Sequence, residues 1–264
     1  MAIDPTATIH PSALIEAGAE IGADCQIGPF CVIGPKVRLG VGVVLKSHVV
    51  ISGLTDVGDG TVVFPFACLG EVPQDLKFRG EETRLIIGKR NRIRENVTMN
   101  TGTDGGGGVT RVGDDGLFMA ASHVAHDCQI GNRVILANNV AIAGHCVLED
   151  EVIVGGLSGV HQFVRIGRGA MIGAVTMVTA DVIPHGMVQG PRGQLDGWNI
   201  VGLRRRGAER TDIQALRDLI GDLAGGSFRD TARARADEGS DNAYVLEVLD
   251  FILGPSDRSF LTPR

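Results

Sequence analysis

Aliphatic residues recur at every sixth position over most of this chain of 264 residues. The series begins at Ile3 and continues to Leu69, resumes at Ile87, and runs from Val112 to Val178 with the aromatic Phe118 as one member. A fixed internal period indicates that one small unit is stacked many times, so it constrains the fold more strongly than local propensity does. It also tells which side chains point inward and which remain available for chemistry.

The position four residues after each aliphatic residue is nearly always small, as at Ala19, Cys31 and Thr61. One large and one small inward residue in every six suits a narrow, parallel stack of short strands, and helical spacing is absent. This pattern resembles the hexapeptide-repeat acyltransferases, which fold as a left-handed parallel β-helix. The resemblance implies three sides and a coil of about 18 residues, so that about ten coils of about 4.8 Å would form a rod of about 50 Å. It also implies the left hand, which departs from the usual right-handed crossover.

The aliphatic register stops at Pro184, and the pattern then becomes helical. Apolar residues between 213 and 223 share one helical face, a second such pattern covers 244–252, and 228–237 is compatible with a helix between them. We therefore predict a mostly β protein, with a left-handed parallel β-helix over residues 1–187 and an α-helical C-terminal domain over 188–264.

The register is interrupted twice. Residues 70–86 carry no aliphatic residue at the expected inward places, and Ile87 follows Leu69 by one full coil length, which predicts that one coil's worth of chain projects as a loop. A charged loop on a rigid scaffold is a favourable place for substrate contacts. Residues 101–109 form a second, glycine-rich break that lacks the frame of a phosphate-binding loop.

Composition limits the partners and the compartment. A net charge of −6 argues against nucleic acid as the main partner. The first residues lack the basic and apolar segments of a secretory signal, and no apolar run long enough to span a membrane occurs, so we expect a cytoplasmic protein without stable membrane insertion. The small inward position is occupied by four cysteines, for which we predict core packing and not catalysis: Cys25, Cys31, Cys128 and Cys146.

Four histidines fall outside the inward positions and should project from the outer face of the prism: His123, His126, His145 and His161. The coil period places Gly144 beside His126. Two chemistries fit such a cluster. One is a metal site, with His123 and His126 in HxxH spacing and His145 as a third ligand. The other is general base catalysis by a neutral imidazole, with Asp127 available to stabilise the imidazolium if a corner turns the two side chains together.

Three segments resemble one family in particular, the UDP-N-acetylglucosamine O-acyltransferases that begin lipid A synthesis. They are GEVPQDLKFRGEETR at 70–84, the histidine-bearing stretch at 122–167, and GWNIVGLRRRG at 197–207. The resemblance implies transfer of an R-3-hydroxyacyl chain from acyl carrier protein to the glucosamine 3-hydroxyl of UDP-N-acetylglucosamine. It further implies a homotrimer with sites between prisms, no cofactor and no metal. A 3-amino sugar nucleotide as acceptor, and a zinc enzyme of the hexapeptide-fold carbonic anhydrase type, remain as alternatives.

The resemblance also implies roles for individual residues. His126 matches the family's general base, which deprotonates the sugar hydroxyl for direct attack on the thioester, and the Gly144 N–H matches its oxyanion donor. Further positions match substrate contacts: Gln74, Asp75, Lys77, His123, His145, His161 and Gln162, with Asn199, Arg205 and Arg206 at the nucleotide end.

Two positions depart from the family pattern. Val201 stands where some members carry an acidic side chain, which affects one nucleoside contact. Ala174 occupies the position of the acyl-length ruler, where glycine leaves a longer groove, so we expect a somewhat shorter chain than a glycine-bearing relative uses.

Basic residues near the first break are candidates for docking the acidic acyl carrier protein: Lys89, Arg90, Arg92 and Arg94. Since the histidines should lie on a flat outer face, we expect that only neighbouring prisms can exclude water from them.

Overall fold

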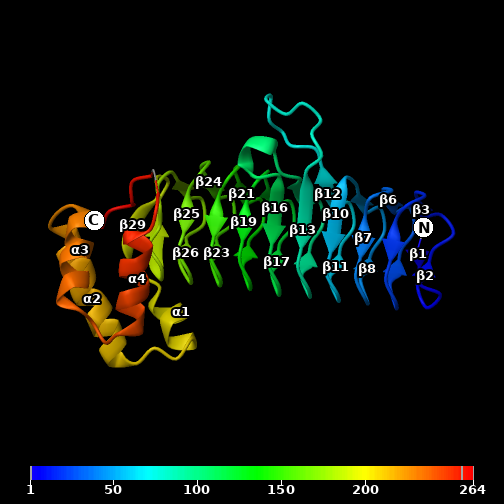
Figure 1. The fold of residues 1–264 in the computed structure, drawn as a ribbon. Coiled ribbons are helices and arrows are strands. Elements are labelled where there is room, and N and C mark those ends of the chain that lie inside the picture. Colours follow the sequence, from blue (N-terminus) through cyan, green and yellow to red (C-terminus); the bar gives the residue numbers. More distant parts are fainter. Residues whose placement is uncertain (1, 257, 264) are drawn as a thin grey trace.

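The computed structural model describes residues 2–256 and 258–263. Stacked coils form a straight rod, with the N-terminus at one end and a group of helices at the other (Figure 1). Each coil contributes one short strand to each of three sheets that run the length of the rod.

All pairings between coils are parallel. The first sheet contains β1 (Ala2–Ile3), β4 (Glu20–Ile21), β7 (Arg38–Leu39), β10 (Leu54–Val57), β13 (Arg84–Ile87), β16 (Val109–Val112), β19 (Gln129–Ile130), β22 (Val147–Leu148) and β25 (Arg165–Ile166). The second contains β2 (Thr8–Ile9), β5 (Gln26–Ile27), β8 (Val44–Leu45), β11 (Val62–Val63), β14 (Arg92–Ile93), β17 (Leu117–Phe118), β20 (Ile135–Leu136), β23 (Ile153–Val154), β26 (Met171–Ile172), β28 (Gly186–Gln189) and β29 (Gln194–Trp198). The third contains β3 (Leu14–Ile15), β6 (Val32–Ile33), β9 (Val50–Ile51), β12 (Cys68–Glu71), β15 (Thr98–Asn100), β18 (His123–Val124), β21 (Ala141–Ile142), β24 (Gly159–Val160) and β27 (Met177–Val178).

The six-residue period fills the interior of the rod. Ile3 pairs with Ile21 in the next coil, and the aliphatic residues of later coils, such as Ile33 and Leu136, are fully buried. The four cysteines in the small inward position are also fully buried, as predicted. The Cys128 thiol donates to the Ala143 carbonyl, and burial raises its pKa well above the ordinary value, so it is a packing group and not a nucleophile.

Corners between strands follow one backbone rule. Each corner has two turn residues, and the second usually has a left-handed φ near +60°, even where it is not glycine. This conformation costs energy for residues with a Cβ. A hydrogen bond to the coil below helps to hold it, as between the His145 N–H and the His126 carbonyl at 3.0 Å. We name the three edges of the prism by the sheets that they join: the 1–2 edge, the 2–3 edge and the 3–1 edge.

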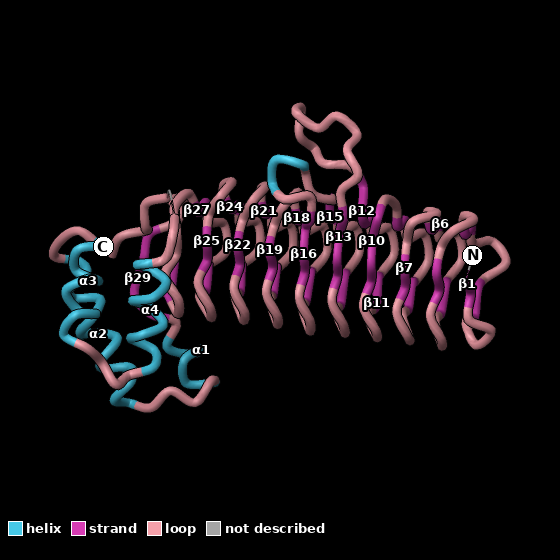
Figure 2. The backbone as a smooth tube through the Cα atoms, in the orientation of Figure 1, coloured by secondary structure: helices cyan, strands magenta, loops and turns pink. Residues whose placement is uncertain are grey.

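Both breaks in the period lie on the 3–1 edge, and their loops project from the same side of the rod (Figure 2). Leu54 in β10 pairs with Arg84 in β13, so the chain between these neighbouring strands is longer than one ordinary coil, and the extra residues lie between β12 and β13. The prediction that a whole coil leaves the prism is therefore wrong: one corner has been lengthened. Leu85 within this segment is fully buried, which also corrects the prediction that 70–86 has no inward aliphatic residue.

The second insertion is shorter and lies in the next coil, where Arg84 pairs with Val109. It contains the short 3₁₀ helix η1 (Asp104–Gly106). Together the two insertions give one edge of the prism a cover that the other edges lack in the described part of the chain.

The helices at the end of the rod are α1 (Ile200–Arg205), α2 (Arg210–Ala224), α3 (Phe228–Glu238) and α4 (Ala243–Leu253). The last three lie where the apolar patterns predicted helices. Sequence reasoning missed α1 and the antiparallel pair β28–β29, which extends the second sheet across the predicted boundary at residue 187. None of the described helices is long and apolar enough to cross a membrane.

Candidate active site

The 3–1 edge carries a buried histidine–aspartate pair at the corner between β18 and β19. Asp127 has φ +61°, and this left-handed turn brings its carboxylate beside the preceding imidazole. His126 Nδ1 lies 2.8 Å from Asp127 Oδ2. The corner on which this pairing depended is therefore present.

The Asp127 carboxylate is fixed by the second insertion. Thr103 donates to it twice, from its backbone N–H at 2.8 Å and from its hydroxyl at 2.6 Å. The Asp127 N–H donates to the Thr110 hydroxyl at 2.7 Å, and only 1% of the Asp127 side chain is exposed. Since a carboxylate can only accept, His126 carries a hydrogen on Nδ1, and in the neutral ring Nε2 is then the nitrogen with a free lone pair.

Gly144 lies against this imidazole from the next coil. A Cβ built on Gly144 would lie 2.5 Å from His126 Cε1 and 2.6 Å from Nε2, so only glycine permits the approach. Among the described residues, the Gly144 N–H donates to no protein acceptor. A free backbone donor next to an imidazole base is the arrangement that an oxyanion site requires.

Two further imidazoles surround the pair. The His145 ring lies edge-on to His126 at 4.9 Å and stacks on Phe163 at 4.4 Å. His123 Nδ1 lies 2.7 Å from the Thr98 hydroxyl. Burial lowers the pKa of His145, against the opposing effect of Asp127, and burial also lowers the pKa of His123. Both rings are therefore favoured as neutral hydrogen-bonding groups.

A cavity of about 420 Å³ opens from His126 along the third sheet. Ala141, Gly159 and Met177 occupy the same outward-facing position in three successive coils and form the floor of this cavity. The small side chains of the first two leave a channel, and the bulkier Met177 lies at one end of it. It is lined by Gln74, His123, Ala125, His126, Ala141, Ile142, Ala143, Gly144, Gly159, Val160, His161, Gln162 and Met177.

The first insertion brings an acidic residue over the site. Asp75 Oδ2 lies 4.0 Å from His126 Nε2. The Lys77 N–H donates to Asp75 Oδ1 at 2.9 Å, and this hydrogen bond, with a smaller effect of His126, holds the pKa of the Asp75 carboxyl below its usual value. The Lys77 side chain itself is exposed.

One chain already buries the candidate base, which corrects the expectation of a flat outer face. His126 is only 4% exposed, while His161 remains exposed. The correction follows from the two insertions, because the six-residue period gives the direction of a side chain and not what covers it.

The residues expected at the nucleotide end lie on a different edge. Asn199 is buried as the N-cap of α1, where its side chain accepts from the Gly202 N–H and donates to the Gly169 carbonyl on the 1–2 edge. Arg206 lies at the same edge, with Nη2 2.9 Å from His185 Nδ1, and the Arg205 side chain is exposed. A single chain thus does not bring these groups to His126.

Other expected positions also lie away from the cavity. Ala174 is exposed at the 2–3 edge, and Val201 is 60% exposed on α1. The basic residues proposed for docking are spread over the 1–2 edge and the second sheet, away from the loop edge near which we had placed them. Three of the four pair with carboxylates: Lys89 with Asp59, Arg90 with Asp115, and Arg94 with Glu95.

The metal alternative also changes its ligand set. Potential ligand atoms of His126, Asp127 and His145 lie within 4.8 Å of one another, whereas His123 is not part of this group. The predicted HxxH pair is therefore wrong as the core of a metal site, and any metal would have to compete with Thr103 for the Asp127 oxygens.

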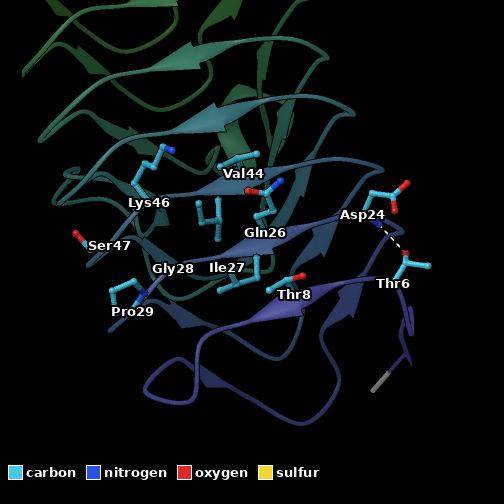
Figure 3. Close-up of a pocket in the computed structure, with 11 residues that line it drawn as sticks. Thr6, Thr8, Asp24, Gln26, Ile27, Gly28, Pro29, Val44, Lys46 and Ser47 are labelled. Atoms are coloured by element: carbon cyan, nitrogen blue, oxygen red, sulfur yellow. Dashed lines mark hydrogen bonds between the residues drawn. The ribbon is translucent and has the colours of Figure 1, made fainter.

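A second hollow, of about 550 Å³, lies on the second sheet of the N-terminal coils (Figure 3). Its charged side chains are Asp24 and Lys46, and it contains no histidine or cysteine. The Thr6 hydroxyl there accepts from the Asp24 N–H at 2.8 Å, a contact between neighbouring coils. Its lining therefore holds no histidine–aspartate pair like that of His126 and Asp127.

Sequence reasoning missed three residues that support the site. Phe163 lies one coil after His145, so the coil period alone would have found its ring contact. Thr110 occupies the small inward position one coil before Cys128. Thr103 carried no signal, because the path of an inserted loop does not follow the period.

Comparisons with known proteins point to one family. Residues 181–261 match the family model described as UDP N-acetylglucosamine O-acyltransferase, domain 2, and residues 18–53 match a bacterial transferase hexapeptide model of six repeats. An acyl-[acyl-carrier-protein]–UDP-N-acetylglucosamine O-acyltransferase from Paracoccus denitrificans is 79% identical over 203 residues, which cover 77% of each chain. The chain belongs to this acyltransferase family.

Other members of the family are similar over nearly the whole chain. The relative of the same name from Sinorhizobium fredii is 49% identical over 84% of this chain and 83% of its own. The solved UDP-N-acetylglucosamine acyltransferase of Campylobacter jejuni has a TM-score of 0.91 and 36% identity, covering 97% of this chain and all of its own. That of Francisella novicida has a TM-score of 0.86 and 34% identity, covering 98% and 94%. The predicted left-handed parallel β-helix with a helical C-terminal region, and the prediction of an acyltransferase, are confirmed.

Proposed function

We propose that this chain transfers an R-3-hydroxyacyl group from acyl carrier protein to the 3-hydroxyl of UDP-N-acetylglucosamine, the first step of lipid A biosynthesis. The observation that carries the proposal is the buried His126 Nε2 beside the Gly144 N–H, neither of which has a hydrogen-bond partner among the described residues, at one end of a channel floored by small residues. The names of the relatives support the substrates.

His126 acts as the general base. Its Nε2 takes the proton of the sugar hydroxyl as that oxygen attacks the thioester carbon, and Asp127 stabilises the imidazolium that forms. The Gly144 N–H stabilises the negative oxygen of the tetrahedral intermediate. The intermediate then expels the thiolate, which takes the proton from His126. General base catalysis typically contributes about 10²–10⁴ in rate, and one oxyanion donor about 10²–10³.

The acyl chain fits the channel on the third sheet, where Ala141 and Gly159 leave room and Met177 narrows one end. We retain the hypothesis that Ala174 shortens the preferred chain. Rates with 10-, 12- and 14-carbon hydroxyacyl donors test it, with Ala174→Gly expected to shift the preference toward the longer donor. Equal rates with all three donors in the unaltered enzyme would refute it.

The working enzyme is a homotrimer whose sites lie between prisms. In support, one chain holds His126 at the 3–1 edge and the expected nucleotide contacts Asn199, Arg205 and Arg206 at the 1–2 edge. A mixture of His126→Ala and Arg205→Ala chains, unfolded and reassembled together, should recover part of the activity that each lacks alone. Mixed trimers without any recovery would contradict a shared site.

The decisive assay measures acyl transfer with EDTA present, for the unaltered chain and His126→Ala in parallel. We expect EDTA to leave turnover unchanged and His126→Ala to abolish nearly all of it, while His48→Ala, on the 2–3 edge, remains active. Running the assay with the 3-hydroxyl and the 3-amino sugar nucleotide distinguishes the two acceptors.

The competing candidate is a zinc enzyme, favoured by the closeness of His126, Asp127 and His145. It predicts one bound metal per site and loss of activity on chelation. Stoichiometric zinc together with EDTA-sensitive turnover would replace the general-base proposal.

A further inference from the structure

The end of the chain returns to the β-helix as a strap, residues 258–263, which pairs with the chain at Asp181. Asp181, which is fully buried, holds it by backbone bonds on both sides: its N–H donates to the Ser259 carbonyl at 2.8 Å, and its carbonyl accepts from the Leu261 N–H at 2.9 Å. Its carboxylate accepts from the Ser256 hydroxyl at 2.7 Å and from Arg165 Nε at 2.8 Å. These hydrogen bonds hold the strap against the β-helix.

This strap delivers Arg258 to the wall of the candidate active site. Arg258 Nη2 lies 3.0 Å from His161 Nδ1 and 2.6 Å from the Gln162 carbonyl oxygen. Both partners line the channel that starts at His126. Arg258 itself is not among the residues that line this channel, so within one chain it acts on a ligand of the channel through these two residues.

The contact determines which ring nitrogen of His161 carries the proton. A guanidinium has no acceptor, so Nδ1 must offer a lone pair to Arg258, and the neutral ring then carries its hydrogen on Nε2. Nδ1 also lies 3.3 Å from the Gln162 carbonyl, and in a chain without Arg258 it would be free to donate to this oxygen, which would leave Nε2 as an acceptor. Arg258 thus decides between two opposite hydrogen-bonding patterns.

We propose that Arg258 is a positioning residue that holds His161 as an Nε2–H donor toward an oxygen acceptor of the substrate in the channel. The acceptor class is a carbonyl, hydroxyl or phosphate oxygen, and this assignment rests on the proposed function of the same site. Arg258 Nη2 also donates to the Gln162 carbonyl oxygen, so this one nitrogen positions both His161 and Gln162.

Nitrogen NMR of ¹⁵N-histidine-labelled protein tests the tautomer without any turnover. In the unaltered chain the His161 proton should lie on Nε2, and in Arg258→Met it should move wholly or partly to Nδ1, while Arg258→Lys keeps the original pattern. The control is Arg229→Met, because Arg229 Nη2 donates to the Ser256 carbonyl at 3.1 Å and steadies the same segment without touching His161. An Nδ1–H in the unaltered chain, or the same tautomer in Arg258→Met, would overturn the proposal.

Kinetics provide the second readout. Arg258→Met should raise the KM of one substrate about tenfold, as the loss of one hydrogen bond does, and change kcat less. It should add nothing further in a chain that already carries His161→Ala. An equal KM increase in Arg229→Met would indicate a merely structural strap. Since the tautomer is measured apart from activity, an inactive enzyme with the predicted tautomers would count against the proposed function alone.

Discussion

The corners of the 3–1 edge and of the 1–2 edge have the same backbone conformation, but within the described chain only the 3–1 edge has corners covered by inserted loops. Asp127 and Asp115 both occupy the left-handed corner position, with φ of +61° and +59°. The side chain of Asp127 is 1% exposed and receives hydrogen bonds from Thr103 and His126. Asp115 has a side chain that is 39% exposed and pairs with Arg90 at 2.7 Å.

The difference shows that the six-residue repeat determines where a side chain lies, whereas the inserted loops determine whether it is exposed to water. On the 1–2 edge, opposite charges of successive coils meet in water, where such pairs contribute little. On the 3–1 edge, two inserted loops exclude water. There an aspartate carboxylate, that of Asp127, holds the hydrogen of the His126 imidazole on Nδ1. In the proposed mechanism, the catalytic chemistry takes place on the covered edge.

The largest expected contrast is between Asp127→Asn and Asp115→Asn. The first should lower kcat by about 10³-fold, because it removes the charge that stabilises the imidazolium and the acceptor that fixes Nδ1–H. The second should leave kcat unchanged. Steady-state kinetics of both variants, with circular dichroism to confirm folding, check this, and similar losses in the two would remove the distinction between the edges.

A smaller loss is expected for Gly144→Ala. The added Cβ would lie 2.5 Å from His126 Cε1 and displace the ring, and a misplacement of about 1 Å costs about 10² in rate. Gly156→Ala is the matched control, since Gly156 holds the same corner position on the 2–3 edge and its Cβ would meet an Asn138 carbonyl at 3.2 Å. If Gly156→Ala loses as much kcat as Gly144→Ala, proximity to His126 is not the cause.

The covered edge should also make stability depend on pH. Burial lowers the pKa of His123 in the folded chain below the ordinary 6.5, so the unfolded chain takes up the proton first as pH falls. The corresponding stability is complete above about 6.5 and is lost as pH falls below it toward the folded pKa. Urea unfolding at pH 7.5 and 5.5 should show a smaller pH effect in His123→Asn than in the unaltered chain. An unaltered pH effect in His123→Asn would contradict the assignment.

The smallest effect is expected on the exposed edge. Arg133 Nη2 lies 2.8 Å from Glu151 Oε1, with half of the arginine side chain exposed. Arg133→Ala should lower the free energy of unfolding by only about 0.2–1 kcal/mol, and by less at high salt. Thermal unfolding at two salt concentrations measures this. A loss of several kcal/mol would show that the ladder of ion pairs holds the rod together.

Sequence reasoning went furthest where the period applies. It placed the buried cysteines, set Gly144 beside His126, and would have led from His145 to Phe163 one coil later. These positions follow from a single repeat distance and need no knowledge of distant contacts.

It failed where the chain leaves the period. Thr103 reaches Asp127 through an inserted loop, and Arg258 reaches His161 through a strap from the far end of the chain. Such contacts depend on tertiary packing, which local pattern does not encode. For the same reason the burial of His126 was missed although its direction and its neighbour Gly144 were predicted.

The most direct test of the covered edge is a double-mutant cycle on kcat for His126→Ala, Asp127→Asn and the combined variant. If Asp127 acts only by holding and charging His126, the combined variant should be no slower than His126→Ala alone. Losses that multiply, or an Asp127→Asn enzyme that turns over at the unaltered rate, would contradict the histidine–aspartate pair as the catalytic unit.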